Sequence, residues 1–86
     1  MGEYRIVFAR SARKELEALE DRMLGRVFAT IETLAAQPRP QGCCKLRGSP
    51  NLWRIRVGDY RVVYAIDDTR RIVDITVVRH RSRAYE

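Results

Sequence analysis

Residues 52–66, with the sequence LWRIRVGDYRVVYAI, decide the fold because apolar and polar side chains alternate on both sides of Gly58 and Asp59. Alternation with a period of two is typical of a β-strand that buries one face. A two-residue connection that begins with glycine suits a type II′ turn. The stretch therefore predicts an antiparallel hairpin with strands over 52–57 and 60–66.

The two-residue turn also predicts which residues face each other across the hairpin. One face should be wholly apolar and should pack against helices; it carries Trp53, Ile55, Val57, Tyr60, Val62 and Tyr64. The other face carries Arg54, Arg56 and Arg61, with Arg56 directly opposite Arg61. Like charges so placed cost up to about 1 kcal/mol, whereas planar guanidinium groups suit bidentate contact with a phosphate. This face is a candidate phosphate site, unless its arginines splay into water or pair with Asp74 and nearby glutamates.

The residues before the hairpin predict one strand and two helices. Residues 4–8 are a short β-rich run, and Ser11 is a candidate N-cap for a helix over 12–20. A second helix should begin at Asp21 and end before Pro38. Its apolar stripe, at spacings of three and four, consists of Leu24, Val27, Phe28, Ile31, Leu34 and Ala35.

Two more strands are expected, a short one over 45–47 and a last one over 72–78. Together these elements predict an α+β fold in one domain over residues 1–86. Its two-helix hairpin should pack on one face of a twisted antiparallel sheet of about four strands.

Charge is distributed unevenly along the chain, which has 17 Lys and Arg residues, 11 Asp and Glu residues and a net charge of +6. Residues 1–43 hold seven basic and six acidic residues, whereas residues 44–86 hold ten and five. A strand-rich half with this excess of arginine favours a polyanionic partner, most simply nucleic acid. Solvated arginines scattered at random are the alternative.

Several classes of protein are disfavoured by the sequence. No apolar run approaches the roughly 18 residues of a membrane span, and the run at 6–9 is too short for a signal peptide, so we expect a cytoplasmic protein without a membrane partner. Cys43 and Cys44 are adjacent, and a disulfide between neighbours is strained. With one histidine and no CxxC spacing, we expect two reduced thiols and no metal site.

The residues after the last predicted strand combine bases with aromatic rings: Arg79, Arg81 and Arg83 with His80 and Tyr85. This combination is typical of sites that stack an unpaired nucleobase beside held phosphates. His80 ionises near neutral pH in its unperturbed state and is a candidate for proton transfer, although a lone histidine is more often structural.

Three segments resemble the RelE/ParE superfamily of bacterial and archaeal toxins: KLRG at 45–48, LWRIRVGDYRVVY at 52–64, and VRHR at 78–81 with Tyr85. The RelE-type branch implies a toxin of a type II toxin–antitoxin system that enters the ribosomal 30S A site and cuts the bound mRNA. The resemblance implies no metal or other cofactor. The 2′-hydroxyl of the RNA attacks its adjacent phosphate, leaving a 2′,3′-cyclic phosphate and a 5′-hydroxyl.

The resemblance also implies roles for the hairpin arginines. Arg54 and Arg56 match two basic strand residues that are lysines in the best-known RelE, and Arg61 matches a phosphate-binding arginine. Arg56 and Arg61 are thus expected in the catalytic site. Further expected contacts to RNA phosphates are Lys45, Arg47 and Arg83.

For the tail, Arg81 matches the catalytic arginine that follows the last strand, and Tyr85 matches the tyrosine that stacks on a base or takes the proton. Because arginine cannot serve as a conventional base, the general base should be Tyr85 or His80.

Two other functions remain open at this point. One is a ParE-type toxin that inhibits DNA gyrase without nuclease activity. The other is a degenerate member that only binds its antitoxin and takes part in autoregulation at DNA. The combination of Arg61, Arg81 and Tyr85 favours the nuclease. Each alternative implies a cognate antitoxin, RelB-like or another small protein, with operator DNA bound only through the antitoxin complex. The nuclease also implies the ribosome and mRNA as partners.

Overall fold

The computed structural model describes residues 3–83. Along the chain its elements are β1 (Arg5–Phe8), α1 (Arg10–Glu17), α2 (Asp21–Thr33), β2 (Cys44–Lys45), β3 (Leu52–Val57), β4 (Tyr60–Asp67), β5 (Ile72–His80) and the 3-10 turn η1 (Arg81–Arg83).

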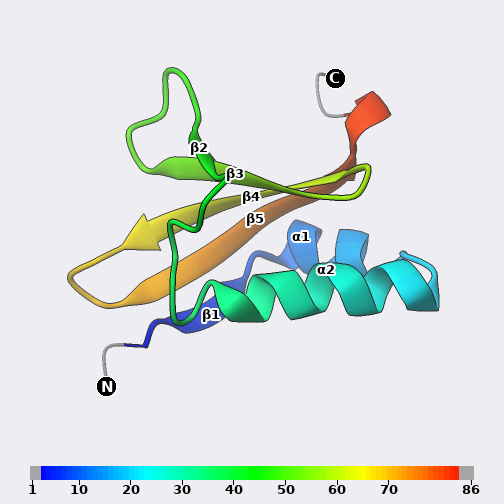
Figure 1. Cartoon of the computed structure of the whole chain (residues 1–86), viewed down its shortest axis with the longest axis horizontal. Coiled ribbons are helices and arrows are strands. Elements are labelled where there is room, and N and C mark those ends of the chain that lie inside the picture. The colour runs from blue at the N-terminus through cyan, green and yellow to red at the C-terminus, as the bar shows by residue number, and fades with distance from the viewer. Residues whose placement is uncertain (1–2, 84–86) are drawn as a thin grey trace.

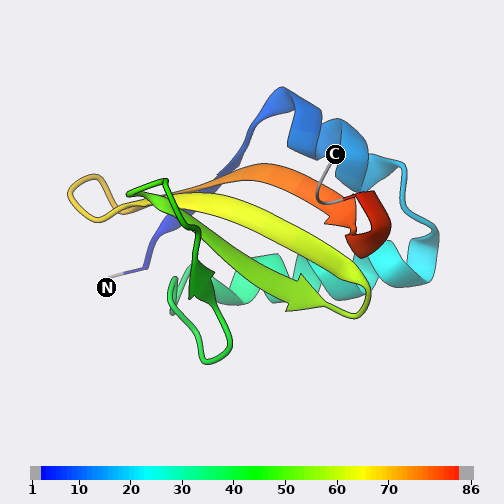
Figure 2. The same ribbon diagram turned by 90° about the horizontal axis from the view of Figure 1, so that it is seen from above.

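The strands form one five-stranded sheet in the order β1-β5-β4-β3-β2. Both helices lie on the same side of this twisted sheet (Figure 1), α1 beside β5 and α2 beneath β3 (Figure 2). The predicted α+β fold with a helix pair on one face is confirmed. The sheet has five strands where about four were expected, and it is mixed rather than purely antiparallel, because β1 pairs with β5 in parallel.

The β3–β4 hairpin has the predicted register, with Val57 opposite Tyr60 and Arg56 opposite Arg61. Gly58 has a φ of +59° and Asp59 is not among the residues of positive φ, as a type II′ turn requires. The apolar face packs as expected. Val57, Val62 and Tyr64 are buried, and Trp53, Ile55 and Tyr60 pack against them while partly exposed.

The first helix begins earlier than the sequence suggested. It starts at Arg10 after Ala9, whose backbone N–H still donates to the Ile75 carbonyl at 2.9 Å. The helix therefore begins as soon as the pairing with β5 ends, and Ser11 is exposed within its first turn rather than acting as the N-cap. The second helix begins at Asp21 as predicted.

The core lies between the helix pair and the sheet, and in the described part of the chain it contains no buried polar or charged residue. It consists of Ala12, Leu16, Val27, Ile31, Leu34, Val57, Val62, Tyr64, Ile66, Val73, Ile75 and Val78. Phe28 was predicted to belong to the apolar stripe of the second helix, but it is 42% exposed.

Tyr64 ties the connection between α2 and β2 to the sheet. Its ring is fully buried and its hydroxyl donates to the carbonyl of Pro38 at 2.8 Å. Nearby, the guanidinium of Arg39 lies 5.1 Å from the Trp53 ring centroid and pairs with Asp68 at 2.9 Å. The loop after α2 is thus held against both β3 and the β4–β5 turn.

Tyr64→Phe should lower the free energy of unfolding at neutral pH by about 1 kcal/mol, because the Pro38 carbonyl loses its donor. Burial raises the pKa of the Tyr64 phenol, so the folded protein keeps a proton that the unfolded chain releases above about pH 10. Stability of the wild type should therefore fall as pH rises beyond 10, and less steeply in the variant. Urea unfolding at neutral and alkaline pH measures both effects; equal midpoints and equal alkaline slopes would contradict them.

Candidate nucleic-acid interface

Arginines gather on the sheet face that points away from the helices. The strand registers place Arg56 opposite Arg61 and Arg61 opposite Arg79, which puts the three in one row across β3, β4 and β5. Arg54 lies two residues from Arg56 on the same face of β3. We call these four residues, Arg54, Arg56, Arg61 and Arg79, the arginine face. Arg56 and Arg79 are exposed, and Arg54 and Arg61 are half-buried.

A bulge in β5 brings Arg79 into this row. The register with β4 shifts by one residue between Val63 and Tyr64, leaving Thr76 as the extra residue on β5. The Thr76 hydroxyl donates to the Val63 carbonyl at 3.1 Å. Because side chains alternate between faces, the shift turns Val78 toward the core and Arg79 toward the arginine face.

The end of β5 also differs from the sequence prediction. We expected the strand to end at Val78, with Arg79 and His80 in a tail, but both residues pair with β4. The signal that could have predicted this is the adjacent pair Val77 and Val78, which interrupts the alternation that precedes it. Two neighbouring apolar residues late in an alternating strand are compatible with a bulge.

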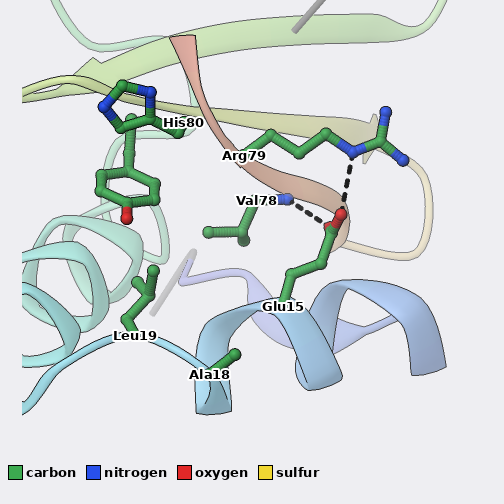
Figure 3. A pocket seen from close by; sticks show the side chains of 7 residues that line it. Glu15, Ala18, Leu19, Val78, Arg79 and His80 are labelled. Atoms are coloured by element: carbon green, nitrogen blue, oxygen red, sulfur yellow. Dashed lines mark hydrogen bonds and ion pairs between the residues drawn. The ribbon is translucent and has the colours of Figure 1, made fainter. Parts of the chain in front are cut away.

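Glu15 on α1 takes the place of a neighbouring strand at the outer edge of β5. β1 ends at Phe8, opposite Ile75. Beyond that point Glu15 Oε1 accepts the Val78 backbone N–H at 2.9 Å, and Oε2 accepts the Arg79 Nε–H at 2.8 Å (Figure 3). Sequence reasoning missed this residue, because nothing in a single acidic position on a helix indicates which strand it will reach.

His80 lies on the opposite side of the sheet from the arginine face. It pairs with Tyr60, and the two rings meet edge to face with centroids 5.3 Å apart. Its Nδ1 accepts the Ser82 backbone N–H at 3.2 Å and lies 2.9 Å from the Ser82 hydroxyl. The ring borders a cleft of about 600 Å3 that Glu15 and Leu19 also line (Figure 3). The structure therefore does not bring His80 together with Arg61.

Arg81 opens η1 beside the β3–β4 turn, at the same end of the sheet as the row. Its backbone N–H donates to the Asp59 carbonyl at 2.7 Å. Its side chain is 72% exposed, and Nε lies 3.9 Å from the Asp59 carboxylate. Such an exposed pair is weak and is screened by salt, so the guanidinium remains available to a ligand. Arg83 closes η1, and Tyr85 lies outside the described residues.

Lys45 and Arg47 do not join the arginine face. Lys45 pairs with Trp53, so it occupies the helix side of the sheet at its edge, and Cys44 takes the position opposite Arg54. Arg47 lies in the loop after β2 and is exposed. The neighbour of Arg54 on the β2 side is thus the free thiol of Cys44.

Acidic residues lie at the far end of the same face. Asp74 is opposite Ala65, four positions along β4 from Arg61, which corresponds to about 13 Å of strand. The register therefore does not favour pairing of Asp74 with the hairpin arginines. Within the row, Arg79 pairs with Glu15 from α1.

Residues 3–83 contain no cluster of potential metal ligands and no membrane-spanning helix. No three His, Cys, Asp or Glu side chains there are grouped so that they could hold a metal ion. No helix in that part of the chain is long and apolar enough to cross a membrane.

The sequence is similar to a known family of proteins. The family model for the ParE toxin of the type II toxin–antitoxin system parDE matches residues 6–85. Toxin RelG of Mycobacterium tuberculosis is 32% identical over 83 residues, which cover 95% of each chain.

Solved structures agree with this assignment. The archaeal RelE–RelB complex from Pyrococcus horikoshii has a TM-score of 0.82 and 29% identity, covering 98% of this chain and 100% of that chain. The isolated RelE toxin of E. coli has a TM-score of 0.82 and 26% identity, covering 94% of this chain and 87% of that chain. The chain therefore belongs to the RelE/ParE superfamily of toxins of type II toxin–antitoxin systems.

Proposed function

We propose that this toxin is a ribosome-dependent endoribonuclease that cuts mRNA in the 30S A site without a metal ion. The observation that carries the proposal is the row of Arg56 and Arg61 on the open face of the sheet, with Arg81 at its end. The similarity to proteins named RelE supports the same branch of the superfamily.

The arginines can supply electrostatic stabilisation but not a base. In the proposed reaction the 2′-hydroxyl gives its proton to a base as its oxygen bonds to the adjacent phosphorus, the bond to the 5′-oxygen breaks, and that oxygen takes up a proton as it leaves. Negative charge develops on the phosphate oxygens, where fixed guanidinium groups stabilise it. Arg54, Arg56 and Arg61 stay protonated throughout, because a guanidinium does not lose its proton in a protein.

We therefore assign to Tyr85 the role of accepting the proton of the 2′-hydroxyl, with His80 as the second candidate. Positive charges near a phenol favour the phenolate and lower its pKa, and a tyrosine ring can also stack on a base and hold the reacting oxygens in line. His80 is the weaker candidate because its ring borders the cleft on the helix side rather than the arginine face.

The partners follow from the same proposal. A cognate antitoxin is supported by the similarity to RelE in its complex with RelB. We propose that its docking segment is acidic and neutralises the basic sheet, that operator DNA is bound only through that complex, and that the toxin acts on cytoplasmic ribosomes and mRNA.

One observation favours a second function, since the matching family model is named for ParE. A ParE-type toxin would bind and inhibit DNA gyrase without cutting RNA. Primer extension on mRNA from cells induced for this protein separates the two functions. Discrete in-frame cuts are expected; intact mRNA together with gyrase-linked DNA breaks would establish the gyrase inhibitor instead.

Arg61→Ala and Arg81→Ala should each lower the rate of mRNA cleavage on programmed ribosomes by about 100-fold to 1,000-fold, the usual effect of removing one electrostatic contact to a transition state. Growth arrest should be lost as well. Arg13→Ala, which removes an exposed arginine from α1, is the matched control and should cleave normally. A steep fall in melting temperature in either test variant would assign that arginine a structural role.

Tyr85→Phe keeps the stacking ring and removes the hydroxyl, so single-turnover cleavage should fall by about 100-fold or more if the hydroxyl takes the proton. His80→Gln should change the rate much less, because its ring is on the helix side of the sheet. Near-normal cleavage by Tyr85→Phe combined with a large loss in His80→Gln would reverse the assignment.

A further inference from the structure

We propose that a cavity on the open face of the sheet, with Asp74 in its wall, is a binding subsite for a guanine base of the RNA. The inference rests on the proposed RNA-cleaving function and names a base that the toxin selects. The cavity has a volume of about 710 Å3 and lies beside the β4–β5 turn. That turn is at the opposite end of the sheet from η1 (Figure 1).

Small and apolar side chains line this cavity around Asp74. The strand registers place Val7 of β1 and Ala65 of β4 on either side of Asp74. Ile72 lies two residues before Asp74 on the same face of β5. Because Ala65 carries only a methyl group, it leaves room over β4 beside the carboxylate. An apolar lining with few polar groups is typical of small-molecule sites, and it suits a flat heterocyclic ring.

Three carboxylates line the cavity, and two of them already have partners in the protein. Asp67 Oδ1 accepts the Arg70 backbone N–H at 3.0 Å. Asp68 pairs with Arg39 at 2.9 Å. Asp74 is half-buried, and in the described part of the chain its carboxylate has no hydrogen bond or ion pair, not even with Arg70. The Asp74 carboxylate can therefore accept hydrogen bonds from a ligand.

Guanine matches a lone carboxylate better than the other three bases do. Its Watson–Crick edge carries the N1–H and an N2–H side by side, so two parallel donors meet the two carboxylate oxygens. Adenine and cytosine each present an acceptor nitrogen next to their amino group, and the carboxylate repels this nitrogen. Uracil has one N–H between two carbonyl oxygens. Unpaired bases of RNA are commonly recognised through this edge.

The distance from the arginine face allows one RNA strand to reach both sites. Asp74 lies opposite Ala65, four positions along β4 from Arg61, which is about 13 Å. A stacked strand rises about 3.4 Å per nucleotide, so the guanine lies about four nucleotides from the phosphate that Arg61 holds, and fewer where the strand is extended. The half-buried Val63 and Val77 lie between the two sites and carry no charge. Asp74 repels phosphates, which favours entry of a base into the cavity.

Binding of oligonucleotides that cannot be cut tests the inference. All riboses are 2′-O-methylated, and fluorescence anisotropy compares a short oligouridine that contains one central guanine with the same oligouridine without it. The guanine should tighten binding by about 5-fold to 100-fold, the usual range for two hydrogen bonds to one base. Hypoxanthine in place of guanine lacks the 2-amino group and should lose most of this gain. 7-Deazaguanine keeps the whole Watson–Crick edge and should retain the gain.

Asp74→Asn gives the sharpest test because it should change the preferred base rather than only weaken binding. An amide offers one acceptor and one donor, which match the amino group and the N1 of adenine. The gain from guanine should therefore vanish, and a central adenine should be preferred to uridine. Asp67→Asn is the matched control: it makes the same charge change in the same cavity and keeps an oxygen for the Arg70 N–H. This control should retain the preference for guanine.

Ala65→Leu tests the cavity without altering the carboxylate. The larger side chain fills the space over β4, so the gain from guanine should be lost. Ala65 does not belong to the arginine face, and the affinity for plain oligouridine should therefore stay unchanged. The melting temperature of this variant checks that the sheet still folds.

Arg61→Gln separates this inference from the proposed function. If it weakens binding of oligouridine while the wild type binds the guanine-containing and plain oligonucleotides equally, this inference is overturned with the proposed function intact. If Arg61→Gln changes no affinity, the arginine face does not bind RNA and both proposals fail. A guanine preference that survives Asp74→Asn would place the guanine elsewhere and overturn the inference. An effect of Asp74→Asn on the antitoxin complex alone would also overturn it and assign the cavity to a basic side chain of that partner.

Discussion

The pairing of β4 with β5 is the contact on which the other elements depend. β5 also pairs with β1 and receives the Glu15 carboxylate from α1, while β4 carries the fully buried Tyr64. One extra residue, Thr76, shifts this pairing. Because side chains alternate along a strand, the shift exchanges the two faces for every residue that follows in β5. It places Val78 in the core and Arg79 among the arginines.

Stability and the proposed chemistry use opposite faces of the sheet. On the helix side the buried residues are apolar, and among the described residues none is a buried charge. On the open side the arginines cluster at the η1 end and Asp74 lies toward the β4–β5 turn. A positive patch of this kind attracts a polyanion and orients it. Substitutions of residues on the arginine face can therefore alter the binding of a polyanion while the apolar layer on the other side preserves the fold.

The hairpin was predictable because its information is local. The period-two pattern over 52–57 and 60–66 and the two-residue turn at Gly58 determine the register without reference to any other element. The apolar face and the grouping of Arg56 with Arg61 follow from that register. The start of α2 at Asp21 was equally local, since an apolar stripe and an acidic first turn lie within a few residues of each other.

The sequence by itself thus determined the α+β class, the hairpin register and the pair of opposed arginines, all of which depend on neighbours along the chain. The tertiary structure alone decided the parallel pairing of β1 with β5, the position of the bulge and the contact of Glu15 with Arg79. The parallel pairing and the Glu15 contact join residues more than 60 positions apart, and the bulge depends on how β5 pairs with another strand. Alternation within one strand does not indicate which sheet edge a distant helix will cover. It also does not indicate at which residue the register with the neighbouring strand will shift.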